Sequence, residues 1–224
     1  MLTVAIADAL LTGQPYQDAV RDWGRCYPRA GYGGSFFQWL FAADPQPYHR
    51  WGNGSAMRVS PVGWAFDSED EVLRQARRSA EITHDHPEGI QGAQATALAV
   101  YLARTGADKA TIRARIQSQF GYDLTQTVET IRLGYTFDVS CQGTVPAAPI
   151  AFLDAESYEE TVRNAVSLGG DSDTPACIAG GIAEAFYGGV PDPIRAEVRA
   201  RLPPDLWRVA EGFERRYGSS RKNL

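Results

Sequence analysis

Two carboxylates and a hydroxyl lie close together in the sequence, directly before an apolar segment. Asp171 and Asp173 are one residue apart, Thr174 follows them, and Gly169 and Gly170 precede them. Carboxylate and hydroxyl oxygens are the hard ligands that Mg²⁺ prefers, and the glycines let the chain turn so that both carboxylates converge. The alternative is an ordinary helix start, in which one acid caps the helix and the other is solvated. Three protein ligands do not fill an octahedral ion, so further oxygens must complete such a site.

Two glycine-rich segments are candidates for ligand binding. Residues 30–35 read AGYGGS and residues 51–58 read WGNGSAMR. Glycine lets the backbone approach a ligand closely, and free N–H groups at a following helix start favour phosphate. Glycine content is an unspecific signal, and two ordinary turns are the alternative.

The histidines offer a further polar site. His84 and His86 flank Asp85, but no third or fourth ligand is spaced for zinc. Each ring is therefore expected to cap a helix or to hydrogen-bond a ligand, since the pKa of histidine permits either role near neutral pH. His49 lies in a proline-rich stretch and is expected to pack or stack at the surface.

The three cysteines do not form a recognisable chemical motif. Cys26, Cys141 and Cys177 are odd in number and far apart, which excludes a disulfide framework and a CxxC zinc site. Their use fits a reducing compartment, so we expect a cytoplasmic protein. None has a basic neighbour that would activate it as a nucleophile.

The elements that must position these residues are helical. Ser68 with Glu71 and Ser157 with Glu160 have capping-box spacing, which predicts a helix start at each serine. Pro87 suits the first turn of another helix. Further helices are expected over residues 2–11, 93–103, 109–120, 178–187 and 206–217, and from residue 193 onward. Because no run alternates apolar and polar residues, we predict an all-α fold in a single domain spanning residues 1–224.

Composition narrows the class of protein. The chain has 224 residues, 44% of them hydrophobic and 22% charged, which is typical of one globular domain. A net charge of −5 argues against nucleic-acid binding. No apolar run approaches the roughly 20 residues that span a bilayer, so no membrane association is expected.

Taken in order, five strings resemble the ADP-ribosylglycohydrolase family, which includes the dinitrogenase reductase-activating glycohydrolases. They are GYGG at residues 31–34, GNGSAMRVSPVG at 52–63, THDHPEGIQGAQA at 83–95, GTVPAAPIAFL at 143–153 and SLGGDSDTPACIAGGIAEAFYGG at 167–189. The resemblance covers nearly the whole chain, and the last string is the most specific. It implies a compact helical bundle with a binuclear magnesium centre at the base of an ADP-ribose cleft.

The resemblance also implies roles for individual residues. Asp171, Asp173 and Thr174 would be metal ligands, with Asp171 or Asp173 accepting a proton from the attacking water; the sequence does not choose between them. Arg58 would brace its loop rather than touch substrate. The residues expected to line the diphosphate and distal ribose or to contact the ligand are Gly31, Tyr32, Gly33, Gly34, Gly52, Asn53, Gly54, Ser55, Ala56, Met57 and His84.

One departure from the family concerns the start of the chain. Family members carry a Gly-Asp segment and a Thr/Ser-Asp-Asp-Thr string ahead of the helix that here begins at Leu2, and those acids supply further metal ligands. That helix also has no capping residue before it. We therefore expect a chain that is N-terminally truncated relative to the family, through a late start, trimming, or true loss of half the metal site.

Two functions follow from the resemblance. The first is Mg²⁺-dependent hydrolysis, in which a metal-positioned water attacks ribose C1″ and releases ADP-ribose from a modified protein side chain or a related small adduct. The second is an ADP-ribose-binding or regulatory module that has lost part of the metal site. A helical scaffold whose acidic motif only caps a helix is a third interpretation. The sequence does not specify the linkage, the target protein, the number of bound ions or the oligomeric state.

Overall fold

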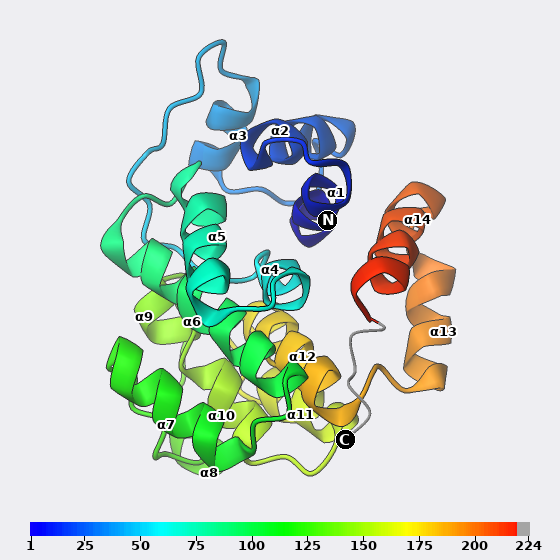
Figure 1. Cartoon of the computed structure of the whole chain (residues 1–224). Coiled ribbons are helices and arrows are strands. Elements are labelled where there is room, and N and C mark those ends of the chain that lie inside the picture. The colour runs from blue at the N-terminus through cyan, green and yellow to red at the C-terminus, as the bar shows by residue number, and fades with distance from the viewer. Residues whose placement is uncertain (219–224) are drawn as a thin grey trace.

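The structure is a computed structural model of the chain, and it describes residues 1–218. Within that range it is helical, with no strand and a single isolated bridge between Gly52 and Ser140. The all-α prediction is confirmed (Figure 1). The helices are α1 Leu2–Thr12, α2 Tyr16–Cys26, α3 Gly34–Phe41, α4 Ser60–Ala65, α5 Glu69–Glu81, α6 Pro87–Arg104, α7 Lys109–Phe120, α8 Val128–Arg132, α9 Cys141–Thr144, α10 Ala147–Leu153, α11 Tyr158–Val166, α12 Asp173–Tyr187, α13 Asp192–Arg201 and α14 Pro204–Phe213, and a π-helical turn follows at Glu214–Gly218.

Local capping signals place the helix ends where the sequence predicts them. The Ser68 hydroxyl accepts a hydrogen bond from the Glu71 amide at the start of α5, and Ser157 does the same for Glu160 at the start of α11. Pro87 is the first residue of α6. Gly121 ends α7 in the left-handed conformation, with φ of 71°. As expected, α1 begins without a side-chain cap.

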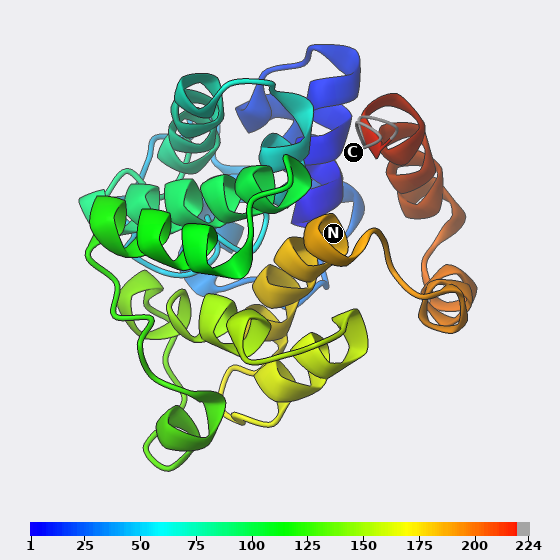
Figure 2. The same cartoon turned by 60° about the horizontal axis from the view of Figure 1, so that its bottom comes forward.

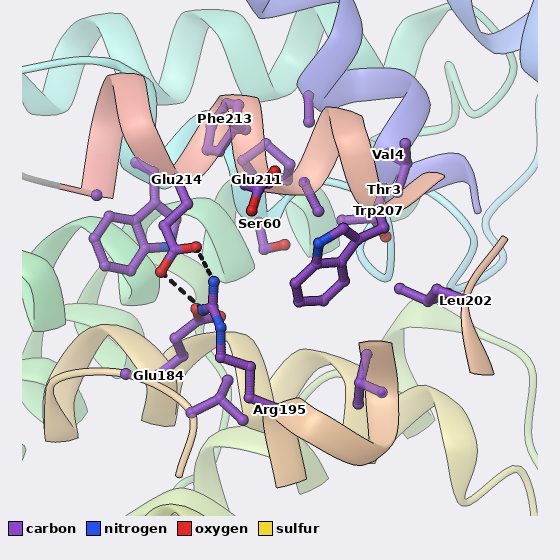
Figure 3. Close-up of a pocket in the computed structure, with 18 of the residues that line it drawn as sticks. Thr3, Val4, Ser60, Glu184, Arg195, Leu202, Trp207, Glu211, Phe213 and Glu214 are labelled. Atoms are coloured by element: carbon purple, nitrogen blue, oxygen red, sulfur yellow. Dashed lines mark hydrogen bonds and ion pairs between the residues drawn. The ribbon is translucent and has the colours of Figure 1, made fainter. Parts of the chain in front are cut away.

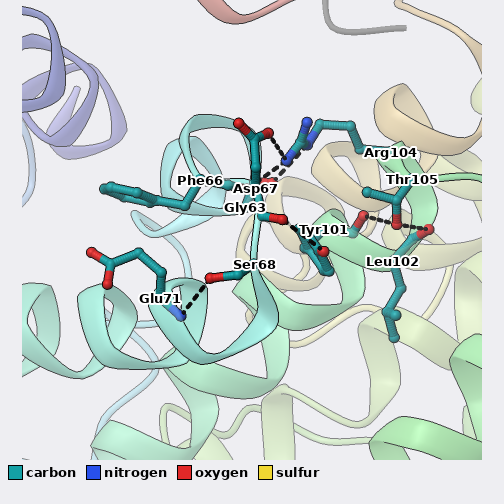
Figure 4. A network of polar contacts seen from close by, with 9 residues as sticks. All are labelled: Gly63, Phe66, Asp67, Ser68, Glu71, Tyr101, Leu102, Arg104 and Thr105. Carbon is teal, nitrogen blue, oxygen red and sulfur yellow. Dashed lines mark hydrogen bonds and ion pairs between the residues drawn. The ribbon is translucent and has the colours of Figure 1, made fainter. Parts of the chain in front are cut away.

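Helix α6 is the centre of the bundle, and α4, α5, α7, α9 and α12 pack around it (Figures 1 and 2). Glycine permits the closest approach: a Cβ atom on Gly63 of α4 would lie 2.6 Å from the Ala97 carbonyl oxygen of α6. Arg104 fixes the same junction by donating from Nε to the Gly63 carbonyl at 3.1 Å, beside the Ser68 cap (Figure 4). The chain from α4 to α5 is thereby tied to the last turn of α6.

Helix α14 packs against α1, and α13 lies at the edge of the molecule (Figures 1 and 2). No residue of α13 is buried. A cavity of about 780 Å³ is lined by residues of α1, α4, α12, α13 and α14 (Figure 3). Across it, Arg195 donates from Nη1 to Glu214 Oε1 at 2.8 Å. None of the site residues predicted from the sequence lines this cavity.

The helices give no sign of a membrane-spanning segment. Within residues 1–218, none is both long enough and apolar enough to cross a bilayer.

Candidate functional site

Asn53 joins the second glycine-rich segment to the acidic motif. The Asn53 amide nitrogen Nδ2 donates to Asp171 Oδ2 at 2.7 Å and to Thr144 Oγ1 at 3.2 Å. Asn53 is only 7% exposed and Asp171 is half-buried, so this contact is shielded from bulk water. Two segments that are 118 residues apart in the sequence therefore meet at one carboxylate.

The segment before α9 holds the Asn53 loop in place. The backbone N–H of Asn53 donates to the Val139 carbonyl at 2.8 Å, and the backbone N–H of Cys141 donates to the Trp51 carbonyl at 2.9 Å. The Cys141 thiol also donates to the Gly52 carbonyl at 3.1 Å. Burial raises the pKa of this thiol to about 12, so it remains a protonated donor. Cys141 is thus structural, as the sequence indicates.

The acidic motif forms a tight turn into α12. Gly169 and Gly170 both have positive φ, 75° and 60°, and a Cβ on Gly170 would lie 2.9 Å from the Thr136 carbonyl oxygen. The Thr174 amide then donates to the Asp171 carbonyl at 3.1 Å. Asp173 is the exposed first residue of α12, whereas Thr174 is buried. The glycine pair is required here, because a side chain at Gly170 would collide with the backbone.

Three polar residues to which no role was assigned from the sequence, Tyr135, Asp138 and Thr144, lie around the contact between Asn53 and Asp171. The Tyr135 hydroxyl is buried beside the Thr144 side chain. Burial raises the pKa of Tyr135, and the nearby Asp171 and Asp138 carboxylates raise it further. Thr144, besides meeting Asn53, donates to the Asp138 carbonyl at 2.9 Å. Tyr135 and Asp138 lie just before the GTVP string, and Thr144 lies within it, so the signal that could have found them is their place next to a string that resembles the family.

The carbonyl of Met57 is a junction between the first and twelfth helices. It accepts hydrogen bonds from Thr3 Oγ1 at 3.2 Å and from Cys177 Sγ at 3.3 Å. Burial lowers the pKa of the amino group of Met1, which lies beside Cys177. The start of α1 is therefore packed next to the start of α12.

The first glycine-rich segment reaches this region only through Met1. The Tyr32 hydroxyl lies 3.6 Å from Met1 Sδ. Gly31, Gly33 and Gly34 are exposed, and a Cβ atom on any of them would meet nothing within 4 Å. The structure records no hydrogen bond from residues 31–34 to Asp171 or to residues 52–57 within the described chain, so their role in binding stays a prediction.

The sequence left open whether His84 and His86 cap a helix or contact a ligand, and the structure places the two rings differently. His86 caps α6, because its Nδ1 atom accepts from the Glu88 amide at 3.2 Å. His84 is only 6% exposed, and its Nδ1 atom lies 2.7 Å from Thr83 Oγ1. Burial, together with the charges of Arg58 and Arg50, holds the pKa of His84 well below its ordinary value. The ring of the exposed His49 packs edge-on against His86, with ring centroids 4.7 Å apart.

Some predicted ligand-binding residues have structural partners instead of open space. Ser55 is fully buried, and its hydroxyl donates to the Gly89 carbonyl at 2.7 Å. Ala56 is 1% exposed and belongs to the hydrophobic core. These two residues anchor the loop, and Asn53 is the residue of the loop that contacts the acidic motif.

The donors at this site match magnesium in kind but not in number. Asp171, Asp173 and Thr174 offer the carboxylate and hydroxyl oxygens that the ion prefers. However, residues 1–218 contain no group of three His, Cys, Asp or Glu side chains placed to hold a metal. A magnesium site at these residues therefore stays a prediction.

Comparison with known proteins defines the class. A solved structure described as an ADP-ribosylglycohydrolase-related protein complex superposes with a TM-score of 0.71 and 27% sequence identity, covering 96% of this chain and 79% of that one. The sequence model of the family described as ADP-ribosylglycohydrolase matches residues 1–222. The chain belongs to the ADP-ribosylglycohydrolase family.

Individual curated relatives show a similar level of sequence identity over a smaller part of the chain. The human ADP-ribosylhydrolase ARH3 is 29% identical over 213 residues, covering 73% of this chain and 55% of its own length. An ADP-ribosylarginine hydrolase, Tri1 from Pseudomonas putida (strain GB-1), is 28% identical over 148 residues, with 61% and 38% covered. The chain thus spans about half the length, or less, of these curated relatives.

Proposed function

We propose that this protein hydrolyses the glycosidic bond between the ribose of ADP-ribose and a modified protein side chain or a related small adduct. Family membership supports this class of reaction. The observation that carries it is the shielded contact between Asn53 and Asp171. This contact joins the GNG segment (residues 52–54) to the acidic motif (residues 171–174). Such a junction offers backbone groups for a diphosphate on one side and carboxylates for the reacting ribose on the other.

The carboxylates perform the proton transfer in this proposal. One of Asp171 and Asp173 accepts a proton as a water oxygen forms a bond to C1″, while the bond from C1″ to the modified side chain breaks. Asn53 restrains Asp171 by donating to Oδ2, which leaves Oδ1 of the same carboxylate available. Asp173 is the more exposed acid and is free to turn toward substrate.

Magnesium belongs to the proposal as a cofactor. Asp171, Asp173 and Thr174 would contribute oxygen ligands, and two ions would be bound in a complete site. When bound, magnesium supplies concentrated positive charge next to the reacting sugar. Water, substrate oxygens or donors outside residues 1–218 would fill the remaining positions.

A second candidate function is an ADP-ribose-binding module without turnover. The lack of a three-residue metal group within residues 1–218 favours it. It keeps the GNG segment and His84 as a ligand site but lacks the full charge needed at C1″.

Release of free ADP-ribose from an ADP-ribosylated protein distinguishes the two functions. If the protein is a hydrolase, we expect release of ADP-ribose. EDTA should abolish this release, added Mg²⁺ should restore it, and the Asp173→Ala variant should lack it. Binding of ADP-ribose measured by calorimetry, with no release from any adduct, would support the binding module instead. If ADP-ribose is neither bound nor released, both functions are contradicted.

A further inference from the structure

His84 is connected to a buried arginine through one hydroxyl. Arg58 is 1% exposed, and its Nη2 atom donates to the Thr83 hydroxyl oxygen at 2.9 Å and to the Ser79 carbonyl at 2.7 Å. Thr83 is fully buried, and its Oγ1 atom lies 2.7 Å from His84 Nδ1. The three side chains form a continuous chain of hydrogen bonds that ends at the imidazole ring.

The direction of each bond follows from donor chemistry. A guanidinium has only donors, so Thr83 Oγ1 must accept from Arg58. The hydroxyl proton of Thr83 points away from that positive charge, and His84 Nδ1 at 2.7 Å accepts it. The Tyr48 hydroxyl also hydrogen-bonds the Thr83 side chain. Burial raises the pKa of Tyr48, so it is a neutral phenol that donates to the second lone pair of Thr83 Oγ1 and leaves the Thr83 proton for Nδ1. Nδ1 is then the acceptor of the ring, and the proton of the neutral imidazole is on Nε2.

The charges around the ring oppose a second proton. Arg58 and Arg50 both disfavour an imidazolium, and His84 has no carboxylate hydrogen-bonded to it within residues 1–218. Within the described part of the chain, Arg58 has no acidic partner either, and its Nε and Nη1 atoms are buried without hydrogen bonds. A buried, unpaired cation therefore lies behind the ring and keeps it neutral.

The free edge of the ring faces the GNG segment. A Cβ atom on Gly54 would lie 3.2 Å from His84 Nε2 and 3.3 Å from Cε1. Glycine at this position therefore leaves Nε2 without a covering side chain. Within residues 1–218, Nε2 has no hydrogen-bond partner of its own.

We propose that Thr83 and Arg58 are positioning residues that hold His84 as a neutral imidazole, whose Nε2–H donates to an acceptor oxygen of the ligand beside Gly54. The inference rests on the proposed function for the identity of that ligand. It specifies a phosphate or hydroxyl oxygen as the partner. It also excludes His84 as a general base at neutral pH, because the nitrogen that faces the ligand already carries the proton.

Nitrogen NMR of the ¹⁵N-histidine-labelled 224-residue chain tests the tautomer directly, with the His84 signals assigned by their loss in His84→Gln. Near pH 7.5 we expect Nε2 to carry the proton and Nδ1 to be pyridine-like. A proton on Nδ1, or an imidazolium, would overturn the inference. Because the tautomer is read from the wild-type chain without ligand, the result does not depend on activity, and the variant serves only to assign the signals.

Variants at Thr83 test the positioning role. Thr83→Val removes the hydroxyl at nearly constant volume, and it should produce a tautomer mixture and weaken ADP-ribose binding about tenfold. Thr83→Ser keeps the hydroxyl and should restore the wild-type tautomer and affinity. A wild-type tautomer in Thr83→Val would overturn the role of Thr83.

Titration with ADP-ribose separates this inference from the proposed function. We expect the His84 Nε2–H signal to shift on binding. If ADP-ribose binds and this signal does not move, the donor role is wrong while the proposed function stands. If ADP-ribose does not bind, the proposed function and the donor role fail together, and the ligand-free tautomer still decides the positioning role.

Discussion

Residues 52–57 and residues 31–34 have similar glycine-rich sequences, yet the protein surrounds them very differently. The first segment is mostly buried. It is hydrogen-bonded to Asp171 and to the residues just before α9. The second is exposed at its three glycines, where added Cβ atoms would meet nothing. Glycine content alone therefore does not identify a built site; what identifies it is the set of distant residues that the backbone contacts.

The largest expected effect breaks the contact that defines the buried segment. Asn53→Asp would place a second carboxylate about where Nδ2 now donates to Asp171 at 2.7 Å. We expect a loss of stability on the order of 3 kcal/mol near pH 7, because two adjacent carboxylates cannot both ionise cheaply. Chemical denaturation measures it.

The same variant carries its own control in its pH dependence. One carboxyl of the new pair would have a raised pKa in the folded state, so protonation favours folding. The deficit relative to wild type should therefore shrink as the pH falls below about 5. A deficit that is constant with pH would show that lost packing, and not charge repulsion, is responsible.

A smaller effect is expected at the glycine that faces His84. In Gly54→Ala the new methyl group would lie 3.2 Å from Nε2, closer than ordinary contact. We expect a loss of about 1–2 kcal/mol in folding stability, and weaker ADP-ribose binding because the methyl group covers the donor. Thermal unfolding and calorimetry measure the two quantities. Unchanged binding would mean that the ligand does not use this edge of the ring.

The pH dependence of stability sharpens the role of His84. Its folded-state pKa lies well below the ordinary value of 6.5, so below pH 6.5 the unfolded chain binds a proton that the folded chain does not. Wild type should therefore lose up to about 1.4 kcal/mol per pH unit as the pH falls below 6.5, and His84→Gln should lack this component. His49→Gln, at an exposed histidine, is the matched control and should retain the wild-type slope.

The smallest effect is expected in the exposed segment. Gly34 begins α3, has no positive φ, and has open space around its missing side chain. Gly34→Ala should change stability by less than about 1 kcal/mol, in the stabilising direction, because alanine reduces the freedom of the unfolded chain. A clear loss of ADP-ribose affinity with unchanged stability would show that this segment approaches the ligand after all, and would weaken the contrast between the two segments.

The parts of the fold that the sequence predicted depend on short-range chemistry. Ser68 and Ser157 cap helices through residues three positions away, and Gly121 ends a helix by its own conformation. Such signals lie within a single turn of helix, so they are visible in the sequence.

The parts that it did not predict depend on contacts between distant residues. Asn53 and Asp171 were each proposed for the site, but their direct bond could not be derived from spacing. Tyr135 and Thr144 were missed because they become site residues only when the turn before α9 packs against the acidic motif. The role of His84 was left open because burial and Arg58, not its neighbours in sequence, set its protonation.

Amide NMR mapping of ADP-ribose on the full chain, in the presence of Mg²⁺, tests the central claim most directly. We predict that the largest shifts occur in residues 52–54, at His84 and in residues 171–174, which the structure brings together from three distant segments. Shifts confined to the cavity between α12 and α14, reported by the Trp207 indole (Figure 3), would contradict the assignment of the site.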